Sequence, residues 1–166
     1  MKAEDQIELV VKTVLSAWET QNTRVNKLVE TLSEEVMLSE IAPGKNRGIY
    51  LLGHLAAVND NLMSLLGVGE KLYPQLTPIF LSNPDNKDIT SPTLTELKQY
   101  WYKINATLSE YFSKMKPSDW FERHTSISAE DFVKEPHRNK LSVILNRTSH
   151  QSYHVGQLML LQKSKQ

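Results

Sequence analysis

The sequence of 166 residues predicts an all-α fold, specifically a four-helix bundle. Apolar residues recur at steps of three and four along four long segments, which is the spacing of one face of an α-helix. Almost no segment shows the alternation typical of a strand. All seven prolines and three of the six glycines lie between the four segments rather than within them. Helices with one apolar stripe each bury those stripes against one another, and a bundle is the simplest way to do so.

The first helix is expected from Glu4 to about Leu32. Its apolar stripe comprises Ile7, Val10, Val11, Val14, Leu15, Trp18, Val25, Leu28, Val29 and Leu32. The polar stretch Thr20–Arg24 is a place for a kink, so the segment predicts either one helix or two nearly collinear ones. A short segment that starts at Ser33 then leads to a loop at residues 42–45.

The second helix is expected from Asn46, as its N-cap, to about Leu66, where Gly67 and Gly69 stop it. The residues predicted to face inward are Ile49, Leu52, Ala56 and Met63. His54 lies near the middle of this helix, directly after Gly53. The small neighbour leaves room for another helix or a ligand to come close.

Two long connections flank the third helix. The first, residues 67–92, contains Pro74, Pro78 and Pro84 and is expected to be irregular with one short turn. It is long enough to cross over and make the second and third helices parallel. Thr93 and Glu96 match a capping box, and this helix should end before Pro117. Its predicted stripe is Leu94, Leu97, Tyr100 or Trp101, Ile104, Leu108 and Tyr111 or Phe112.

The fourth helix follows the second long connection, residues 117–136, and is expected over residues 141–161. No proline interrupts it. The three tryptophans, Trp18, Trp101 and Trp120, are predicted to pack in the core. Trp101 and Tyr102 are adjacent on one helix, so only one of them can point inward.

Composition and charge restrict the function. Nineteen basic and 19 acidic side chains cancel, which argues against nucleic acid as a partner because phosphate binding needs a basic face. The chain has no cysteine, which excludes a disulfide, a cysteine nucleophile and a thiolate metal site. We expect a single domain over residues 1–166, with no membrane partner. The polar residues 1–6 do not resemble a secretory signal, so a cytoplasmic location is expected.

The histidines of the fourth segment are the main candidates for chemistry. His150 and His154 are four residues apart, so their rings share one face of the helix and could bind one metal ion, with His54 as a third ligand. Spacing alone favours exposed rings or satisfied core rings over a metal site, since a motif match is only a hypothesis. It is not the zinc-protease pattern H-E-x-x-H, because Gln151 follows His150.

The residues Asn46-Arg-Gly-Ile-Tyr-Leu-Leu-Gly-His54-Leu and Ser149-His150-Gln-Ser-Tyr-His154-Val-Gly-Gln157-Leu resemble the DinB/YfiT-like family. The resemblance covers nearly the whole chain. It implies a four-helix bundle in which His54, His150 and His154 bind a divalent metal, with zinc, nickel, iron or manganese all open.

The same resemblance implies several possible activities. Relatives include thiol S-transferases that use a metal to activate bacillithiol or mycothiol, so a thiol S-transferase or a hydrolase acting on a small electrophile is expected. A low-molecular-weight thiol would then be a substrate, and a homodimer is expected because relatives commonly form one. The alternative is a non-catalytic, stress-related binding or scaffold bundle with a vacant or structural triad.

Three polar residues are candidates for substrate binding. Arg147 and Gln157 lie on the same stripe of the fourth helix as the two histidines, and Asn61 is seven residues after His54 on the second. Arg147 could bind a carboxylate with both guanidinium nitrogens or form a surface ion pair. No residue stands out as a general base. His124 and His137 are expected to be exposed in or beside the second long connection.

Overall fold

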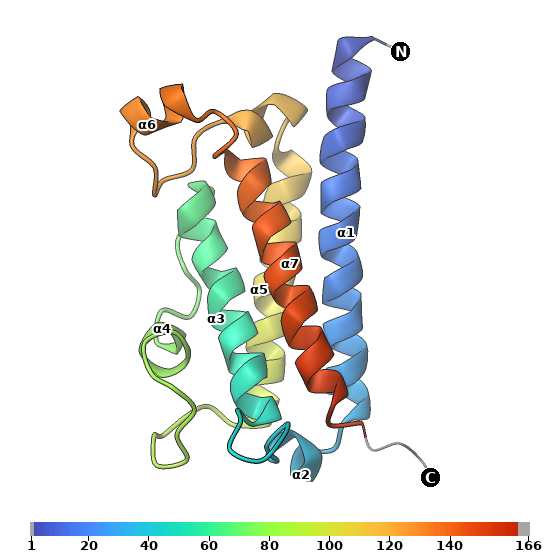
Figure 1. Cartoon of the computed structure of the whole chain (residues 1–166), viewed down its shortest axis with the longest axis vertical. Helices are drawn as coiled ribbons and strands as arrows, with labels where there is room; N and C mark the ends of the chain where they lie inside the picture. The colour runs from blue at the N-terminus through green and yellow to red at the C-terminus, as the bar shows by residue number, and fades with distance from the viewer. Residues whose placement is uncertain (1, 163–166) are drawn as a thin grey trace.

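The computed structural model describes residues 2–162, and four long helices dominate them (Figure 1). These are α1 (Ala3–Thr31), α3 (Gly48–Leu66), α5 (Leu94–Lys114) and α7 (Lys140–Met159). The shorter helices are α2 (Glu34–Met37), α4 (Leu76–Phe80), η1 (Pro117–Phe121, a 3-10 helix) and α6 (Ala129–Lys134). Within this part of the chain there is no strand, only two isolated β-bridges. The predicted all-α helical bundle is confirmed.

The long helices form two parallel pairs. Figure 1 shows α3 and α5 running in one direction and α1 and α7 running in the other. The most extensive helix contacts join α1 to α7 and α3 to α5, while α3 and α7 also meet. The long connection between α3 and α5 therefore crosses over, as the sequence predicted. None of the described helices is long and apolar enough to span a membrane.

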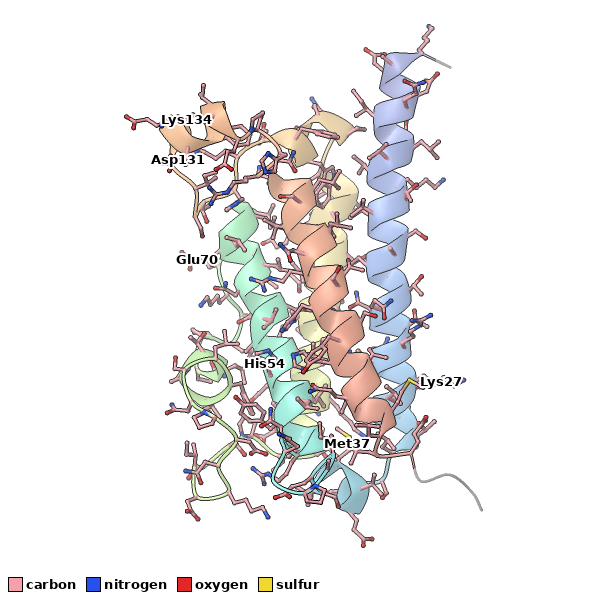
Figure 2. All side chains as sticks on the ribbon, viewed as in Figure 1. Lys27, Met37, His54, Glu70, Asp131 and Lys134 are labelled. Atoms are coloured by element: carbon pink, nitrogen blue, oxygen red, sulfur yellow. The ribbon has the colours of Figure 1, made fainter. Side chains whose placement is uncertain are left out.

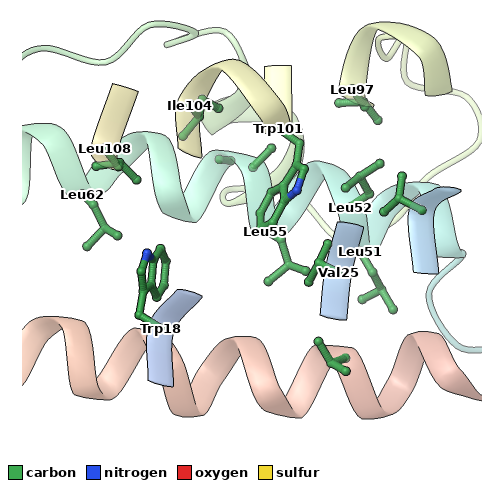
Figure 3. Packing of buried hydrophobic residues seen from close by; sticks show 14 of the residues in the cluster. Trp18, Val25, Leu51, Leu52, Leu55, Leu62, Leu97, Trp101, Ile104 and Leu108 are labelled. Atoms are coloured by element: carbon green, nitrogen blue, oxygen red, sulfur yellow. The ribbon is translucent and has the colours of Figure 1, made fainter. Parts of the chain in front are cut away.

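The core fills the space between the four helices (Figure 3). All three tryptophans are buried, and so are the four residues predicted to face inward from α3. Trp101 donates a hydrogen bond from its indole Nε1 to the side chain of Asn26, so its one polar atom is satisfied inside the core. Tyr102 instead points outward and donates to Glu30. The structure thus confirms that only one of the two adjacent aromatic residues is in the core.

The stretch Thr20–Arg24 does not divide the first helix, which is continuous in α1. The hydroxyls of Thr20 and Thr23 donate to the carbonyls of Ser16 and Glu19, four residues earlier. These bonds occupy the threonine side chains without taking any backbone N–H out of the helix. The polar stretch therefore leaves α1 intact, and its Asn22 accepts a hydrogen bond from the buried Gln151 of α7.

The start of α3 differs by one residue from the prediction. Arg47, and not Asn46, is the N-cap, and its own side chain does not cap the helix. The Asp85 carboxylate accepts hydrogen bonds from the Arg47 backbone N–H at 2.8 Å and from its guanidinium at 2.6 Å. A side chain 38 positions along the chain thus replaces a local cap. The predicted end is confirmed, because Gly67 adopts a left-handed conformation with φ 67°.

The connections contain more helix than their sequences suggested. The first holds α4, which is the predicted short turn, and the second holds η1 and α6. The capping box of Thr93 and Glu96 is present at the start of α5, which ends at Lys114. Asn139 caps α7 by accepting a hydrogen bond from the Ser142 N–H. These ends fix the register of α7 and so the positions of its histidines.

Candidate metal centre

Three imidazole rings from two helices come together between α3 and α7. His54 lies on the side of α3 that is next to α7 (Figure 2). Its Nε2 is 3.2 Å from Nε2 of His150, which is in turn 3.1 Å from Nε2 of His154. The three nitrogens all lie within 4.8 Å of one another. Because His150 and His154 are one helical turn apart, α7 supplies both from a single face.

The outer nitrogens of two rings are held by hydrogen bonds. His54 Nδ1 lies 2.9 Å from the Phe80 carbonyl oxygen, which can only accept, so Nδ1 carries the proton. His154 Nδ1 lies 2.7 Å from the side-chain Oε1 of Gln157 and donates to it. The Nε2 atom of each ring therefore presents its lone pair to the centre of the cluster. Partners of this kind fix the tautomer and the orientation of metal-binding histidines.

The three Nε2 atoms cannot all be joined by hydrogen bonds, because too few of them carry a proton. His54 and His154 each direct a lone pair inward, and His150 can supply at most one N–H between them while it is neutral. The other nitrogen of His150, Nδ1, is buried without a hydrogen-bond partner. At least one close nitrogen–nitrogen contact therefore lacks a proton, and a cation at the centre would remove the repulsion.

Protonation does not readily supply that cation. Burial, followed by the neighbouring His154, His54 and Arg147, lowers the pKa of His150 to about 4. Burial also lowers the pKa of His154, although its hydrogen bond to Gln157 opposes this. Both rings are neutral near pH 7, which is the form that binds a metal. Imidazole ligands suit zinc, nickel, copper or iron, so the donor set fits a divalent metal.

Helix α4 reaches the site because Gly53 has no side chain. A Cβ at this position would overlap the ring of Phe80. The close approach brings the Phe80 carbonyl to His54, while the Tyr50 hydroxyl donates to the Asn83 carbonyl at 2.7 Å and holds the following loop. The room that the sequence predicted beside His54 is therefore occupied by a protein segment.

The Arg47–Asp85 ion pair fastens that loop to the start of α3. Both side chains are largely shielded from solvent. Hydrogen bonding to Asp85 raises the pKa of Arg47. Burial alone would raise the pKa of Asp85, but the hydrogen bonds from Arg47 outweigh it and lower that pKa. The loop after α4 is thus tied to α3 by charge as well as by packing.

Of the other residues that the sequence singled out, Gln157 lies beside the triad, whereas Asn61, Arg147, His124 and His137 lie away from it. Gln157 contacts the triad through His154, and its amide nitrogen donates to the Tyr153 hydroxyl. Asn61 and Arg147 line an open cavity together with His124, apart from the three imidazoles. His124 is therefore partly buried rather than exposed. His137 is exposed and precedes the N-cap of α7, as expected.

Two groups near the triad had no clear signal in the sequence. The Phe80 carbonyl is a backbone group, so no residue type marks it, although Gly53 beside His54 hinted at a close neighbour. Tyr153 precedes His154, and their rings meet edge to face at 5.1 Å between centroids. Its position at i−4 from Gln157 was readable from helical spacing once Gln157 had been singled out.

Comparisons with known proteins agree with this architecture. The model of the DinB superfamily matches residues 17–158, a range that includes all three histidines. No protein with curated annotation matches the chain. A solved structure of a conserved protein from Enterococcus faecalis is similar in fold, with a TM-score of 0.59 and 17% sequence identity over 92% of this chain and 96% of that one. Since the family model covers most of its length, the chain belongs to the DinB superfamily.

Proposed function

We propose that this protein is a metal-dependent enzyme that activates a thiol or a water molecule for attack on a small electrophilic substrate, as a thiol S-transferase or a hydrolase. The observation that carries the proposal is the convergence of three Nε2 atoms, with the rings of His54 and His154 each held by a hydrogen bond at the outer nitrogen. Membership of the DinB superfamily supports it. The metal would be held by His54, His150 and His154.

A divalent metal bound there would lower the pKa of a thiol or water that it binds and would polarise the substrate. The chain's own contribution is positional. The Phe80 carbonyl and the Gln157 amide each hold one ring with its lone pair facing inward, so the rings need little rearrangement to bind. Three protein ligands also leave a coordination position for a substrate, which is typical of catalytic sites.

The surroundings of the triad favour a thiol over water. Within residues 2–162 no Asp or Glu joins the histidine cluster, so no carboxylate is placed there as a general base. A free thiol has a pKa of about 8.5, whereas that of water is about 15.7. A thiol therefore needs a smaller pKa shift from the metal, and less help from a base, to lose its proton than water does. We accordingly expect a low-molecular-weight thiol to be the nucleophile, with thiol transfer as the reaction.

The test is the metal content of protein prepared without a histidine tag. We expect about one equivalent of zinc, nickel, iron or manganese, measured by mass spectrometry, and restoration by added metal after chelation. His154→Ala should abolish uptake while circular dichroism still shows a folded helical protein. His137→Ala is the matched control, because this ring is exposed and away from the triad.

Two outcomes would count against the proposal. Metal uptake that is unchanged in His154→Ala would show that the ligands lie elsewhere. A wild-type protein that takes up none of Zn²⁺, Ni²⁺, Fe²⁺ and Mn²⁺ would leave the triad without a metal role and favour the non-catalytic binding bundle.

A further inference from the structure

The open cavity lined by Asn61, His124 and Arg147 lies where α3 and α7 meet, beyond the triad. Its volume is about 400 Å³, and it is open to solvent. It is lined by Asn61 and Leu65 of α3, His124 and Ser126 of the α5–α7 connection, and Val143, Asn146 and Arg147 of α7. The cavity is large enough for a small organic molecule.

The cavity continues the metal centre along the same seam. Arg147 is three residues before His150 on α7, and Asn61 is seven residues after His54 on α3. Because these two helices run in opposite directions (Figure 1), both residues are displaced from the triad toward the same end of the bundle. A rise of 1.5 Å per residue places them about 5 Å and about 10 Å along the helix axes from their histidines. A ligand of a few bonds could therefore span from Arg147 to the triad.

Arg147 is a partly buried charge without a partner. No hydrogen bond or ion pair involves its guanidinium among residues 2–162, whereas four other Lys or Arg side chains there form ion pairs. Burial lowers the pKa of Arg147, and no neighbouring carboxylate offsets that effect. A guanidinium stays charged at neutral pH in any case. Desolvating a charge without compensation is costly, and a bound anion would repay that cost.

The rest of the lining fits an anion that carries a carbon skeleton. No Asp or Glu lines the cavity, and the side-chain amides of Asn61 and Asn146 have no hydrogen-bond partner within the described part of the chain. Burial, followed by Arg138 and Arg123, lowers the pKa of His124, so this ring is neutral near pH 7. Leu65 and Val143 provide apolar walls. The side chains that line the cavity thus include one cation, two free amides and two apolar groups. This set matches a monocarboxylate better than a doubly charged phosphate.

We propose that this cavity binds the carboxylate of a small substrate, with Arg147 as the anchoring residue, so that the reactive end of the same molecule reaches the histidine triad. The substrate class is a short carboxylic acid that carries its thiol a few bonds from the carboxylate. The carboxylate site stands on the cavity alone, whereas the placement of the thiol rests on the proposed function. Arg147 is thus a substrate-binding residue.

The experiment uses propionate with metal-free protein, and 3-mercaptopropionate with cobalt-loaded protein. Propionate binding is followed by NMR through the side-chain resonances of Arg147 and Asn61. We expect Arg147→Gln to weaken propionate about tenfold or more, which is typical for loss of a charged hydrogen-bonded pair. Arg147→Lys should weaken it less, and Asn61→Ala should weaken it without removing the charge. Arg24→Gln, an exposed arginine of α1, should leave the affinity unchanged.

The cobalt protein tests the link between the two sites. Its thiolate absorption band should appear at lower concentrations of 3-mercaptopropionate than of the uncharged 3-mercaptopropanamide. Arg147→Gln should abolish that preference and leave cobalt content unchanged. Three outcomes would each overturn the proposal. They are equal binding of the acid and the amide, tighter binding of inorganic phosphate than of propionate, and a loss of propionate affinity in Arg24→Gln as large as that in Arg147→Gln. A protein that binds propionate but no metal would support the carboxylate site and refute the metal function. A protein that binds metal but no propionate would refute the carboxylate site alone.

Discussion

At the scale of single residues, the orientation of one ring depends on one side chain. Gln157 accepts the Nδ1–H of His154, which fixes the inward lone pair. We expect Gln157→Ala to weaken metal binding about tenfold to hundredfold, as losses of such outer partners usually do. Gln157→Glu should preserve it, because a carboxylate also accepts this hydrogen bond. Competition with a chromophoric chelator measures both.

The control for Gln157 is another glutamine on the surface. Gln6→Ala, on the exposed start of α1, should leave the metal affinity unchanged. An alanine variant at position 157 that binds metal as tightly as the parent protein would show that packing against Tyr153, and not the hydrogen bond, holds the ring of His154.

The lowered pKa of His150 predicts how the stability of the metal-free protein depends on pH. Its pKa is about 4 in the folded protein and about 6.5 in an unfolded chain. As pH falls from about 6.5 toward 4, the unfolded chain takes up a proton at this residue and the folded protein does not, so the free energy of unfolding decreases. The contribution is fully present above about pH 6.5. Since the ring is partly exposed, we expect a loss of about 1 kcal/mol, well below the full linkage value.

Urea denaturation in the presence of a chelator, at pH 7 and at pH 4.5, measures this loss. His150→Gln removes the titrating ring, so its midpoint should fall less between the two pH values. The lowered pKa of His154 contributes in the same direction and remains in that variant. A midpoint that drops equally in both proteins would mean that His150 is not the ring responsible.

At the scale of elements, α4 depends on the absence of a side chain at Gly53. We expect Gly53→Ala to destabilise the protein by about 1–3 kcal/mol, because the new methyl group would force the Phe80 ring out of its place. The carbonyl of Phe80 would move with it, so metal affinity should fall as well. Thermal denaturation and the chelator competition measure the two effects.

Gly156→Ala provides the matched control. It lies on α7 two residues from His154, and a Cβ there would meet nothing within 4 Å. Because alanine favours a helix over glycine, this variant should be more stable by roughly 0.5–1 kcal/mol. If both alanine variants change stability in the same direction and by the same amount, helix propensity rather than the contact with Phe80 is responsible.

The elements also show which features are readable from sequence. The long helices, the capping box at Thr93 and the left-handed Gly67 depend on residues close together in the chain, so their patterns predicted them correctly. The residues raised the grouping of His54 with the α7 histidines as one possibility, but spacing alone favoured exposed or core rings, and only the family resemblance made a metal site the expectation. The cap of α3 by Asp85 was missed because its two partners are 38 residues apart. The partner of His54 was missed because it is a backbone carbonyl.

At the scale of the whole molecule, the triad lies where two helix pairs meet. The pairs α1–α7 and α3–α5 each have extensive contacts, whereas α3 and α7 contact each other at fewer residues. A metal held by His54 from one pair and by His150 and His154 from the other would link the two pairs directly. Such a link stabilises the folded state only, because the unfolded chain does not bring these residues together.

This arrangement predicts a metal-dependent melting temperature. At a free metal concentration 100 times the dissociation constant, the gain is about 2.7 kcal/mol, which corresponds to roughly 5–10 °C for a chain of this size. Adding a chelator should remove the gain, and His154→Ala should melt at the same temperature with and without metal. His137→Ala should behave as the parent protein does. A melting temperature that rises equally with metal in His154→Ala would place the stabilising ion at another site and leave the seam between the helix pairs held by packing alone.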